Sequence, residues 1–333
     1  MQERRRHAEC DAVLASRFLL YHVVPEKAGE LIDSRPQITV ITPSLNHGNY
    51  LAQNLASVAL QGSYSVEQLI LDGGSTDSTQ DVVAAFDHAQ YVHLPKSNQS
   101  EALNEGFRRA KGEVICWLNT DDIVLPGAFE TALSSLERSG PRTYLTSHYL
   151  MVDEDLGLLR RHRLPPFSSF LYRNYAVYLP TSGSFISNTV AADGISLDPS
   201  LEILMDRDYA LKLLEGGYRF LHHDGYLSAF RLHQDNKSGV GRLFKGQTDP
   251  RAERRLSERQ RISDDYGGLF LGDRRLVGPS QLLSKLAWAT LVANLRARRL
   301  RVRAEDAIGM GDIAPTLARW THKIARDNRE RGL

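Results

Sequence analysis

An apolar run that ends in acids constrains the fold of this chain more than any other stretch. In the segment EVICWLNTDD, residues 113–122, five apolar residues run without a polar break into Asn119, Thr120, Asp121 and Asp122. Such a run is typical of a parallel strand that helices cover on both faces. Ligands of open α/β sheets bind just beyond the carboxyl ends of these strands, so the acids stand where a ligand would bind.

The paired acids at the end of this strand have two interpretations. Adjacent carboxylates repel each other, and a divalent cation bound between them and a substrate phosphate would relieve that repulsion. Alternatively, Asp121 and Asp122 only form a turn and cap a helix that begins near Pro126. Taken alone, this segment favours the turn.

Composition narrows the class of protein. The 333 residues suffice for one large domain with additions, and a formal net charge of +1 argues against dedicated nucleic-acid binding. Cys10 and Cys116 form neither a disulfide framework nor a metal-type spacing, so we expect a cytoplasmic protein. No segment is long and apolar enough to span a bilayer.

Strand and helix patterns alternate in the first part of the chain. Strand patterns over residues 38–42, 69–71, 91–94 and 114–118 are separated by segments with helical apolar spacing. This βαβαβαβ series predicts a mostly parallel sheet, whose strands all end at the same edge. Acids that follow two different strands would therefore meet there, which favours a ligand site over a simple turn: they are Asp72, Asp121 and Asp122.

Loop sequences refine this picture. After the second strand, Asp77 and Gln80 in the loop GGSTDST have the spacing of a capping box. The loop after the first strand is PSLNHGN, which lacks the G-x-G-x-x-G pattern and argues against a dinucleotide-dependent dehydrogenase.

Three motifs together resemble those of glycosyltransferase family 2, the inverting nucleotide-sugar enzymes with the GT-A fold. They are ITVITPSLN, LDGGSTDST and NQSEALNEGFRRAKGEVICWLNTDD, and later segments extend the resemblance to Ser238: LEILMDRDYALKLLEGGYRF and LSAFRLHQDNKS. The resemblance implies a GT-A, Rossmann-like α/β domain over residues 37–240, with a mostly parallel sheet flanked by helices. Its donor half would cover 37–122 and its acceptor half 123–240, between a helical N-terminal extension, 1–36, and a basic, mainly helical region, 241–333.

The resemblance also implies a donor site with a divalent ion, Mg²⁺ or Mn²⁺. The ion would bind Asp121 and His233, with Asp122 in support. Simpler roles remain open for some of these side chains, because Asp72 could brace the GGST turn, Asp77 could cap a helix, and His233 could lie on the surface of an edge strand. The donor nucleotide would contact Pro43, Asn46, Asp72, Asp77, Ser100 and Asn119.

Two positions depart from the family pattern. Asn119 stands where the broad family has the first Asp of D-x-D, so we expect it to contact the ribose and not to act as a charged metal ligand. Leu45 stands where the family often has an aromatic residue, so the base would lie on Pro43 and an apolar wall.

The acceptor side centres on MDRD. An inverting transfer needs a base near the acceptor hydroxyl, opposite the departing diphosphate, and the resemblance assigns that role to Asp206. Asp208 would then be a structural acid in the first turn of a helix, where the helix dipole favours it.

The resulting prediction is a metal-dependent inverting hexosyl- or N-acetylhexosaminyltransferase. A UDP-sugar would be the donor and a saccharide or lipid-linked saccharide the acceptor, in bacterial surface polysaccharide or glycolipid synthesis. Alternatives are a nucleotide-sugar-binding protein with impaired catalysis, which Asn119 invites, and a sugar-1-phosphate nucleotidylyltransferase, which PSLNHGN disfavours. The basic segment 283–303 is either a packed terminal helix or a helix on the inner membrane surface.

Overall fold

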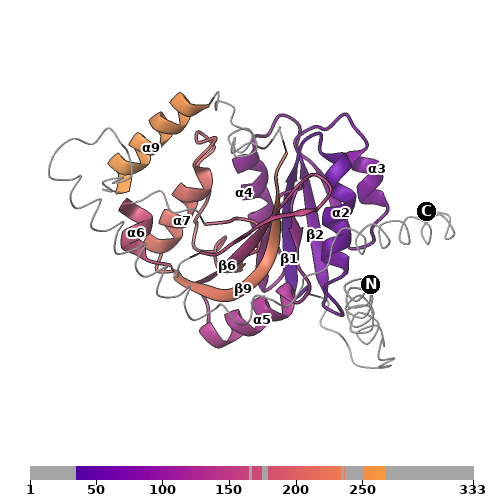
Figure 1. Ribbon diagram of the computed structural model, residues 1–333, viewed down its shortest axis with the longest axis horizontal. Coiled ribbons are helices and arrows are strands. Elements are labelled where there is room, and N and C mark those ends of the chain that lie inside the picture. The colour runs from indigo at the N-terminus through magenta and orange to yellow at the C-terminus, as the bar shows by residue number, and fades with distance from the viewer. Residues whose placement is uncertain (1–34, 165–166, 175–178, 234–235, 237–250, 267–333) are drawn as a thin grey trace, which may run out of the picture.

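A mixed β-sheet with helices on both faces forms the centre of the computed structural model (Figure 1). The structure describes residues 35–164, 167–174, 179–233, 236 and 251–266. Within them the strands are β1 (Ile38–Ser44), β2 (Val66–Asp72), β3 (Ala89–His93), β4 (Val114–Trp117), β5 (Ile123–Val124), β6 (Thr143–Val152), β7 (Leu158–His162), β8 (Ser184–Ser187) and β9 (Arg219–Arg231). The helices are α2 (Gly48–Ala59), α3 (Thr79–Ala84), α4 (Gln99–Arg109), α5 (Ala128–Ser139), α6 (Ser169–Asn174), α7 (Met205–Glu215) and α9 (Ala252–Tyr266).

The order of the strands confirms the predicted α/β sheet. It runs β3-β2-β1-β4-β8-β6-β9-β5, and β7 pairs with β6. Pairing is parallel from β3 through β2 and β1 to β4, as the alternating pattern predicts. Beyond β4 the pairing is mixed, because β8 lies antiparallel between β4 and β6 while β6 and β9 run parallel.

Alternate residues of the buried strands pack on opposite faces of the sheet. Val40 of β1 belongs to the apolar cluster that includes Phe129 of α5, whereas its neighbour Ile41 packs in the cluster of Leu103 of α4 and Tyr209 of α7. Full burial of one such side chain contributes roughly 1.5–3 kcal/mol. Helices therefore cover both faces of the parallel strands and leave the strand ends as the place for polar residues.

Two helix starts differ from interpretations considered above. Helix α5 begins at Ala128, after Gly127 in a left-handed conformation (φ 81°), and its N-cap has no side-chain hydrogen bond among the described residues. Asp121 and Asp122 therefore do not cap it. The capping box expected at Asp77 is likewise not formed in the described chain, where Ser78 is the N-cap of α3 without a side-chain bond.

A capping box is present instead at the start of α4. The Asn98 side chain accepts a hydrogen bond from the Glu101 amide at 3.0 Å, and the Glu101 carboxylate accepts one from the Asn98 amide at 2.8 Å. This arrangement satisfies two of the amides that a helix N-terminus leaves without partners.

The described helices include none that is long and apolar enough to cross a membrane. The predicted N-terminal extension, apart from its last residues, and the basic segment 283–303 lie outside the described residues.

Candidate active site

The candidate site lies at the carboxyl edge of the parallel strands. Ser44 at the end of β1 pairs in register with Asp72 at the end of β2, and Ile41 of β1 pairs with Trp117, the last residue of β4. The segment from Asn119 to Asp122 thus leaves the sheet at the same edge as Asp72. This is the convergence that the sequence predicts.

Asp121 and His233 form the centre of the site. His233 Nε2 lies 2.9 Å from Asp121 Oδ2, although the two residues are 112 positions apart in the sequence. The His233 side chain is 2% exposed and that of Asp121 is 14% exposed. Asn236 Nδ2 donates to the same Asp121 oxygen at 3.2 Å, and its Oδ1 accepts from the His233 amide. His233 is therefore not the surface residue that the simpler interpretation proposes.

The donor set of this pair fits a divalent ion that also binds substrate oxygens. The 2.9 Å between Asp121 Oδ2 and His233 Nε2 is a hydrogen-bond distance, and it is also close to the roughly 3 Å that separates adjacent ligands of an octahedral ion with bonds of about 2.0–2.1 Å. The buried Nδ1 of His233 has no hydrogen-bond partner among the described residues. Two protein ligands leave coordination positions that a diphosphate could fill.

Asp122 points away from solvent and supports its neighbour. Its carboxylate accepts hydrogen bonds from the Ser182 hydroxyl and, at 3.0 Å, from the Arg231 amide. Burial, followed by repulsion from Asp121, raises the pKa of Asp122 well above its usual value. Burial and the neighbouring charge of Asp121 thus both act against the charged form of Asp122.

Arg231 is a functional candidate that the sequence reasoning missed. Its buried guanidinium donates to the Asp121 carbonyl at 2.9 Å and to the Glu154 carbonyl at 3.0 Å, and it lies 4.7 Å from the ring centroid of Tyr50. Tyr50 in turn packs against His233, with ring centroids 5.0 Å apart. Arg231 thus fixes the backbone that carries the candidate metal ligand.

Asn119 is held in one orientation by several hydrogen bonds. Its Oδ1 accepts from Trp117 Nε1 at 3.0 Å, and its carbonyl accepts from Asn54 Nδ2 at 2.8 Å. An amide suits the Trp117 donor, and Asn119 adds no third negative charge beside Asp121 and Asp122.

Asp72 braces the glycine-containing turn that follows β2. One carboxylate oxygen accepts from the Gly74 and Ser75 amides at 3.0 and 2.8 Å and from the Tyr91 hydroxyl at 2.8 Å. Burial raises the pKa of Asp72, but hydrogen bonds from Ser75, Tyr91 and Gly74 outweigh it, so the pKa is lowered. These bonds support the bracing role, and a contact with the nucleotide remains a prediction.

Asn46 and Asp77 join the two loops of the expected donor side. Asn46, which has a positive φ of 54°, accepts from the Thr76 amide at 2.9 Å. Asp77 Oδ2 accepts from the Gly48 amide at 2.9 Å at the start of α2, while its Oδ1 accepts from the Thr79 amide at 3.1 Å. Asp77 thus binds the first amide of both α2 and α3 but does not form the expected capping box.

The remaining donor-side candidates differ in exposure. The Pro43 carbonyl accepts from the Thr120 hydroxyl at 2.6 Å, and the neighbouring Leu45 side chain is exposed on the same loop. Ser100 is buried, and its hydroxyl contacts Met205 Sδ at 3.0 Å. Ser100 therefore connects α4 to α7, and a direct donor contact remains a prediction.

The two acids of MDRD have different environments in the first turn of α7. Asp206 is partly exposed, and its Oδ1 accepts from the Arg207 amide at 2.8 Å. Asp208 is buried and binds the Tyr266 hydroxyl and Lys212 Nζ, each at 2.8 Å. Asp208 is thus engaged in packing contacts, while Asp206 is accessible at the end of the helix that contacts Ser100.

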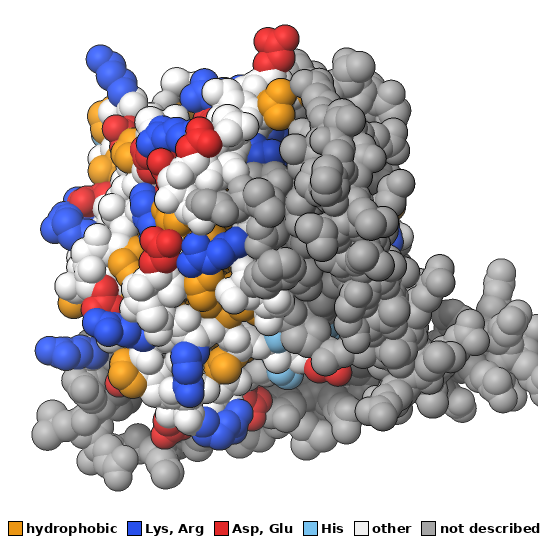
Figure 2. Space-filling view, turned by 90° about the vertical axis from the view of Figure 1, so that its left-hand side faces the viewer, with side chains coloured by type: hydrophobic (Ala, Val, Ile, Leu, Met, Phe, Trp, Pro, Cys, Tyr) orange, Lys and Arg blue, Asp and Glu red, His pale blue; other side chains and the backbone are white. Residues whose placement is uncertain are grey.

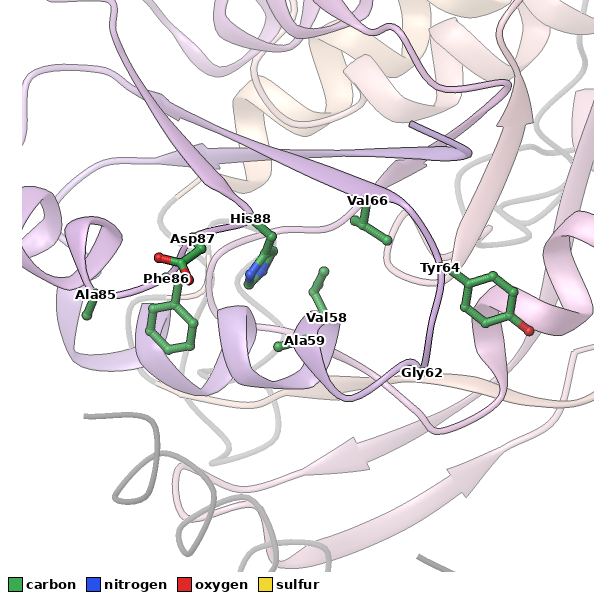
Figure 3. Close-up of a pocket in the computed structure, with 9 residues that line it drawn as sticks. All are labelled: Val58, Ala59, Gly62, Tyr64, Val66, Ala85, Phe86, Asp87 and His88. Carbon is green, nitrogen blue, oxygen red and sulfur yellow. The ribbon is translucent and has the colours of Figure 1, made fainter. Parts of the chain in front are cut away.

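A pocket of about 320 Å³ lies at the opposite edge of the sheet (Figure 3). It is lined mostly by apolar side chains near the start of β2 and the end of α2, and the His88 ring points toward Val58 and Ala59. Burial lowers the pKa of His88 to about 4, so this histidine is neutral at neutral pH. The pocket contains none of the predicted site residues.

A second group with metal-like spacing occurs in the described residues, at His148, His222 and Asp224. The Leu164 amide donates to His148 Nδ1 at 3.2 Å, so the proton of the neutral ring lies on Nε2, which faces Asp224 at 2.9 Å. A protonated nitrogen has no lone pair for a metal, and the hydrogen bonding therefore disfavours an ion there.

Comparisons with known proteins agree with the geometry. The family model described as Glycosyl transferase family 2 matches residues 39–192. Among curated relatives, an uncharacterized glycosyltransferase from Rickettsia felis is 30% identical over 129 residues, which is 38% of this chain and 21% of the relative. The glycosyltransferase GlyG from Streptococcus pneumoniae is 28% identical over 123 residues, which is 35% of this chain and 41% of the relative. The chain thus spans less than half the length of these relatives.

Solved structures show the same fold. Residues 1–349 of S. aureus TarS align with a TM-score of 0.51 at 15% identity, over 88% of both chains. The complex of TarS 1–349 with UDP-GlcNAc aligns with a TM-score of 0.53, also at 15% identity, over 88% of this chain and 89% of that one. On the match of residues 39–192 and this shared architecture, the chain contains a glycosyl transferase family 2 domain with the GT-A fold.

Proposed function

We propose that this chain is a metal-dependent inverting glycosyltransferase that moves a sugar from a UDP-sugar to a hydroxyl group of a saccharide or lipid-linked saccharide. The observation that carries the proposal is the Asp121–His233 pair at the carboxyl edge of the sheet. It joins a strand end of the family domain to a residue 112 positions later, at the spacing of two ligands of one ion.

The donor would lie between the edge of the sheet and the two loops that Asn46 and Asp77 connect. Pro43, Asp72 and Asn119 stand on this edge, and the exposed Leu45 offers an apolar surface for a base. The TarS structures with UDP-GlcNAc and UDP support a uridine nucleotide and an N-acetylhexosamine as the first candidates for the donor.

Asp121 and His233 would hold Mg²⁺ or Mn²⁺ against the diphosphate, and such an ion offsets the negative charge that develops on the leaving group. Asp122 and Arg231 keep this pair in place. The Asp122 carboxylate binds the Arg231 amide, and the Arg231 guanidinium binds the Asp121 carbonyl. Neither of them needs to touch the donor.

Asp206 would act as the general base. The acceptor oxygen attacks the anomeric carbon while its proton passes to the Asp206 carboxylate, and the nucleoside diphosphate leaves from the opposite face. The configuration at the anomeric carbon inverts in this single displacement. Support comes from the chain of contacts from Asn119 through Gln99 and the start of α4 to Met205, which ties α7 to the metal side of the site.

A nucleotide-sugar-binding protein with impaired catalysis is the second candidate, and Asn119 is the observation that favours it. The side-chain amide carries no charge where the broad family has an acid, and its Oδ1 accepts a hydrogen bond from Trp117. A binding protein would hold UDP and Mn²⁺ without releasing UDP from a UDP-sugar.

One experiment separates these candidates. The full chain is incubated with UDP-GlcNAc or other UDP-sugars, Mn²⁺ and a panel of saccharide acceptors, and UDP release is followed together with the anomeric configuration of the product by NMR. We expect UDP release that stops with EDTA and a product of inverted configuration. Metal-independent release or a product of retained configuration would contradict the proposed mechanism, and binding without release would favour the binding protein.

We place this reaction in the assembly of a bacterial surface polysaccharide or glycolipid, since the curated relatives above are bacterial. Residues 37–240 would form the catalytic domain, in the cytoplasm, with peripheral membrane contact through the region 241–333.

A further inference from the structure

The backbone amides just before α7 are bound by a side chain from another helix and not by a capping residue of α7 itself. Its N-cap, Leu204, has no side-chain capping bond among the described residues. Instead, three consecutive amides just before the helix converge on one carboxylate from α9. Glu258 accepts from the Glu202 amide at 2.8 Å and from the Ile203 and Leu204 amides at 2.9 Å each.

Glu258 is buried and charged in this position. Its side chain is 7% exposed, and Arg254 of the same helix pairs with it at 3.1 Å. Burial raises the pKa of Glu258, but the amide bonds from residues 202–204 and the Arg254 bond outweigh it, and the pKa is lowered. The three amides therefore receive charge-assisted hydrogen bonds, which are stronger than bonds to a neutral acceptor.

Further contacts hold the part of α9 that follows this carboxylate. Arg261 binds Asp198 at 2.5 Å, and Tyr266 binds Asp208 at 2.8 Å. Ile262 is buried in the same apolar cluster as Tyr209 of α7. Figure 1 shows α9 beside α7, and on this side of the molecule basic and acidic side chains are interspersed (Figure 2). The charges of α9 thus point to local pairing and not to a large surface of one sign.

Asp206 lies between two of these attachment points, Leu204 and Asp208. A carboxylate in the first turn of a helix takes its direction from the backbone that enters the helix. We propose that Glu258 is a positioning residue for glycosyl transfer: it fixes residues 202–204 and thereby aims Asp206 at the acceptor hydroxyl. This inference rests on the proposed function, because it requires Asp206 to be the base.

The alternative is that α9 only adds packing. Ile262→Ala removes packing of α9 without touching the carboxylate that binds the amides, so it is the matched control for Glu258→Gln. The glutamine retains one carbonyl oxygen but places an NH₂ group against backbone amides. Hydrogen exchange on the full chain should show faster exchange of the amides of residues 202–204 in Glu258→Gln than in Ile262→Ala at similar melting temperature. Equal protection in the two variants would overturn the proposal.

Turnover then tests the link to Asp206. The assay uses Mn²⁺, UDP-GlcNAc or another UDP-sugar that the enzyme turns over, and water or a saccharide as the acceptor. In this assay Glu258→Gln should lower kcat by about 10- to 100-fold, with little change in the KM for the donor. In the Asp206→Asn background the same change should lower kcat by less than about 2-fold, since the base it positions is already absent.

The outcomes separate the two ideas. If Asp206→Asn lowers kcat strongly and Glu258→Gln still lowers the residual kcat by its full factor, the positioning role is wrong and the proposed base stands. If Asp206→Asn keeps full turnover, the assignment of the base fails, and the positioning role fails with it.

Discussion

Asp72 offers the sharpest test of how the donor edge is built. In Asp72→Asn one oxygen remains to accept from the Gly74 amide, the Ser75 amide and the Tyr91 hydroxyl, but it carries no net charge. Hydrogen bonds to charged groups contribute about 1.5–3 kcal/mol and neutral ones about 0.5–1.5 kcal/mol, so each of the three bonds loses about 1 kcal/mol. We therefore expect the free energy of unfolding to fall by about 3 kcal/mol at pH 7.

The pH dependence of this loss has a definite sign. The folded pKa of Asp72 is lowered, because the bonds from Ser75 and Tyr91 outweigh the effect of burial. Its carboxylate therefore stabilises the fold above the unfolded pKa of about 3.9, and this stabilisation is lost as the pH falls through the folded pKa. The difference between the wild type and Asp72→Asn should be complete at pH 7 and shrink in acid.

Urea unfolding at pH 7 and at several pH values below 4 measures this difference. Asp81→Asn serves as the control, because Asp81 is an exposed acid on α3. A loss below about 0.5 kcal/mol at pH 7, the size of an ordinary surface substitution, would refute the bracing role. So would a difference that does not change with pH.

Other substitutions test the acceptor side and the packing of the sheet. Asp206→Asn should lower kcat by about 10²- to 10⁴-fold while calorimetry shows unchanged UDP affinity, and near-normal turnover would remove it as the base. Asp208→Asn should lower the free energy of unfolding, measured in urea, by about 1–3 kcal/mol, because its bonds to Tyr266 and Lys212 are weakened, and kcat should stay nearly unchanged. A large loss of kcat in the folded variant would contradict this. Gly106→Ala should destabilise by about 1–3 kcal/mol despite a better helix propensity, because the new Cβ would lie 2.6 Å from Leu71 Cδ1, and unchanged stability in urea would count against this close contact.

The first half of the sheet could be predicted because its strands carry short apolar stretches that alternate with helical patterns. Buried parallel strands leave a continuous signal, and β4 with its terminal acids is the clearest case. The later strands give a weaker signal, since β9 mixes charged, polar and apolar residues from Arg219 to Arg231. Its pairing with β6 is long-range, and no local period specifies it.

Local spacing was also an imperfect guide to single side chains. Asp77 and Gln80 have the spacing of a capping box, but the Asp77 carboxylate accepts from the Gly48 and Thr79 amides and not from that of Gln80. Asn98 and Glu101 have the same spacing and do form the box. The roles of Arg231 and Glu258 depend on partners up to 110 positions away, so only the assembled fold reveals them.

Calorimetric titration of UDP into the full chain tests the central claim, that Asp121 and His233 hold a divalent ion for the donor diphosphate. We expect binding with Mn²⁺, loss of that binding with EDTA, and an affinity lowered by more than about 10-fold in Asp121→Asn but unchanged in Asp81→Asn. Equal affinity in Mn²⁺ and EDTA, or undiminished metal-dependent binding by Asp121→Asn, would contradict the account.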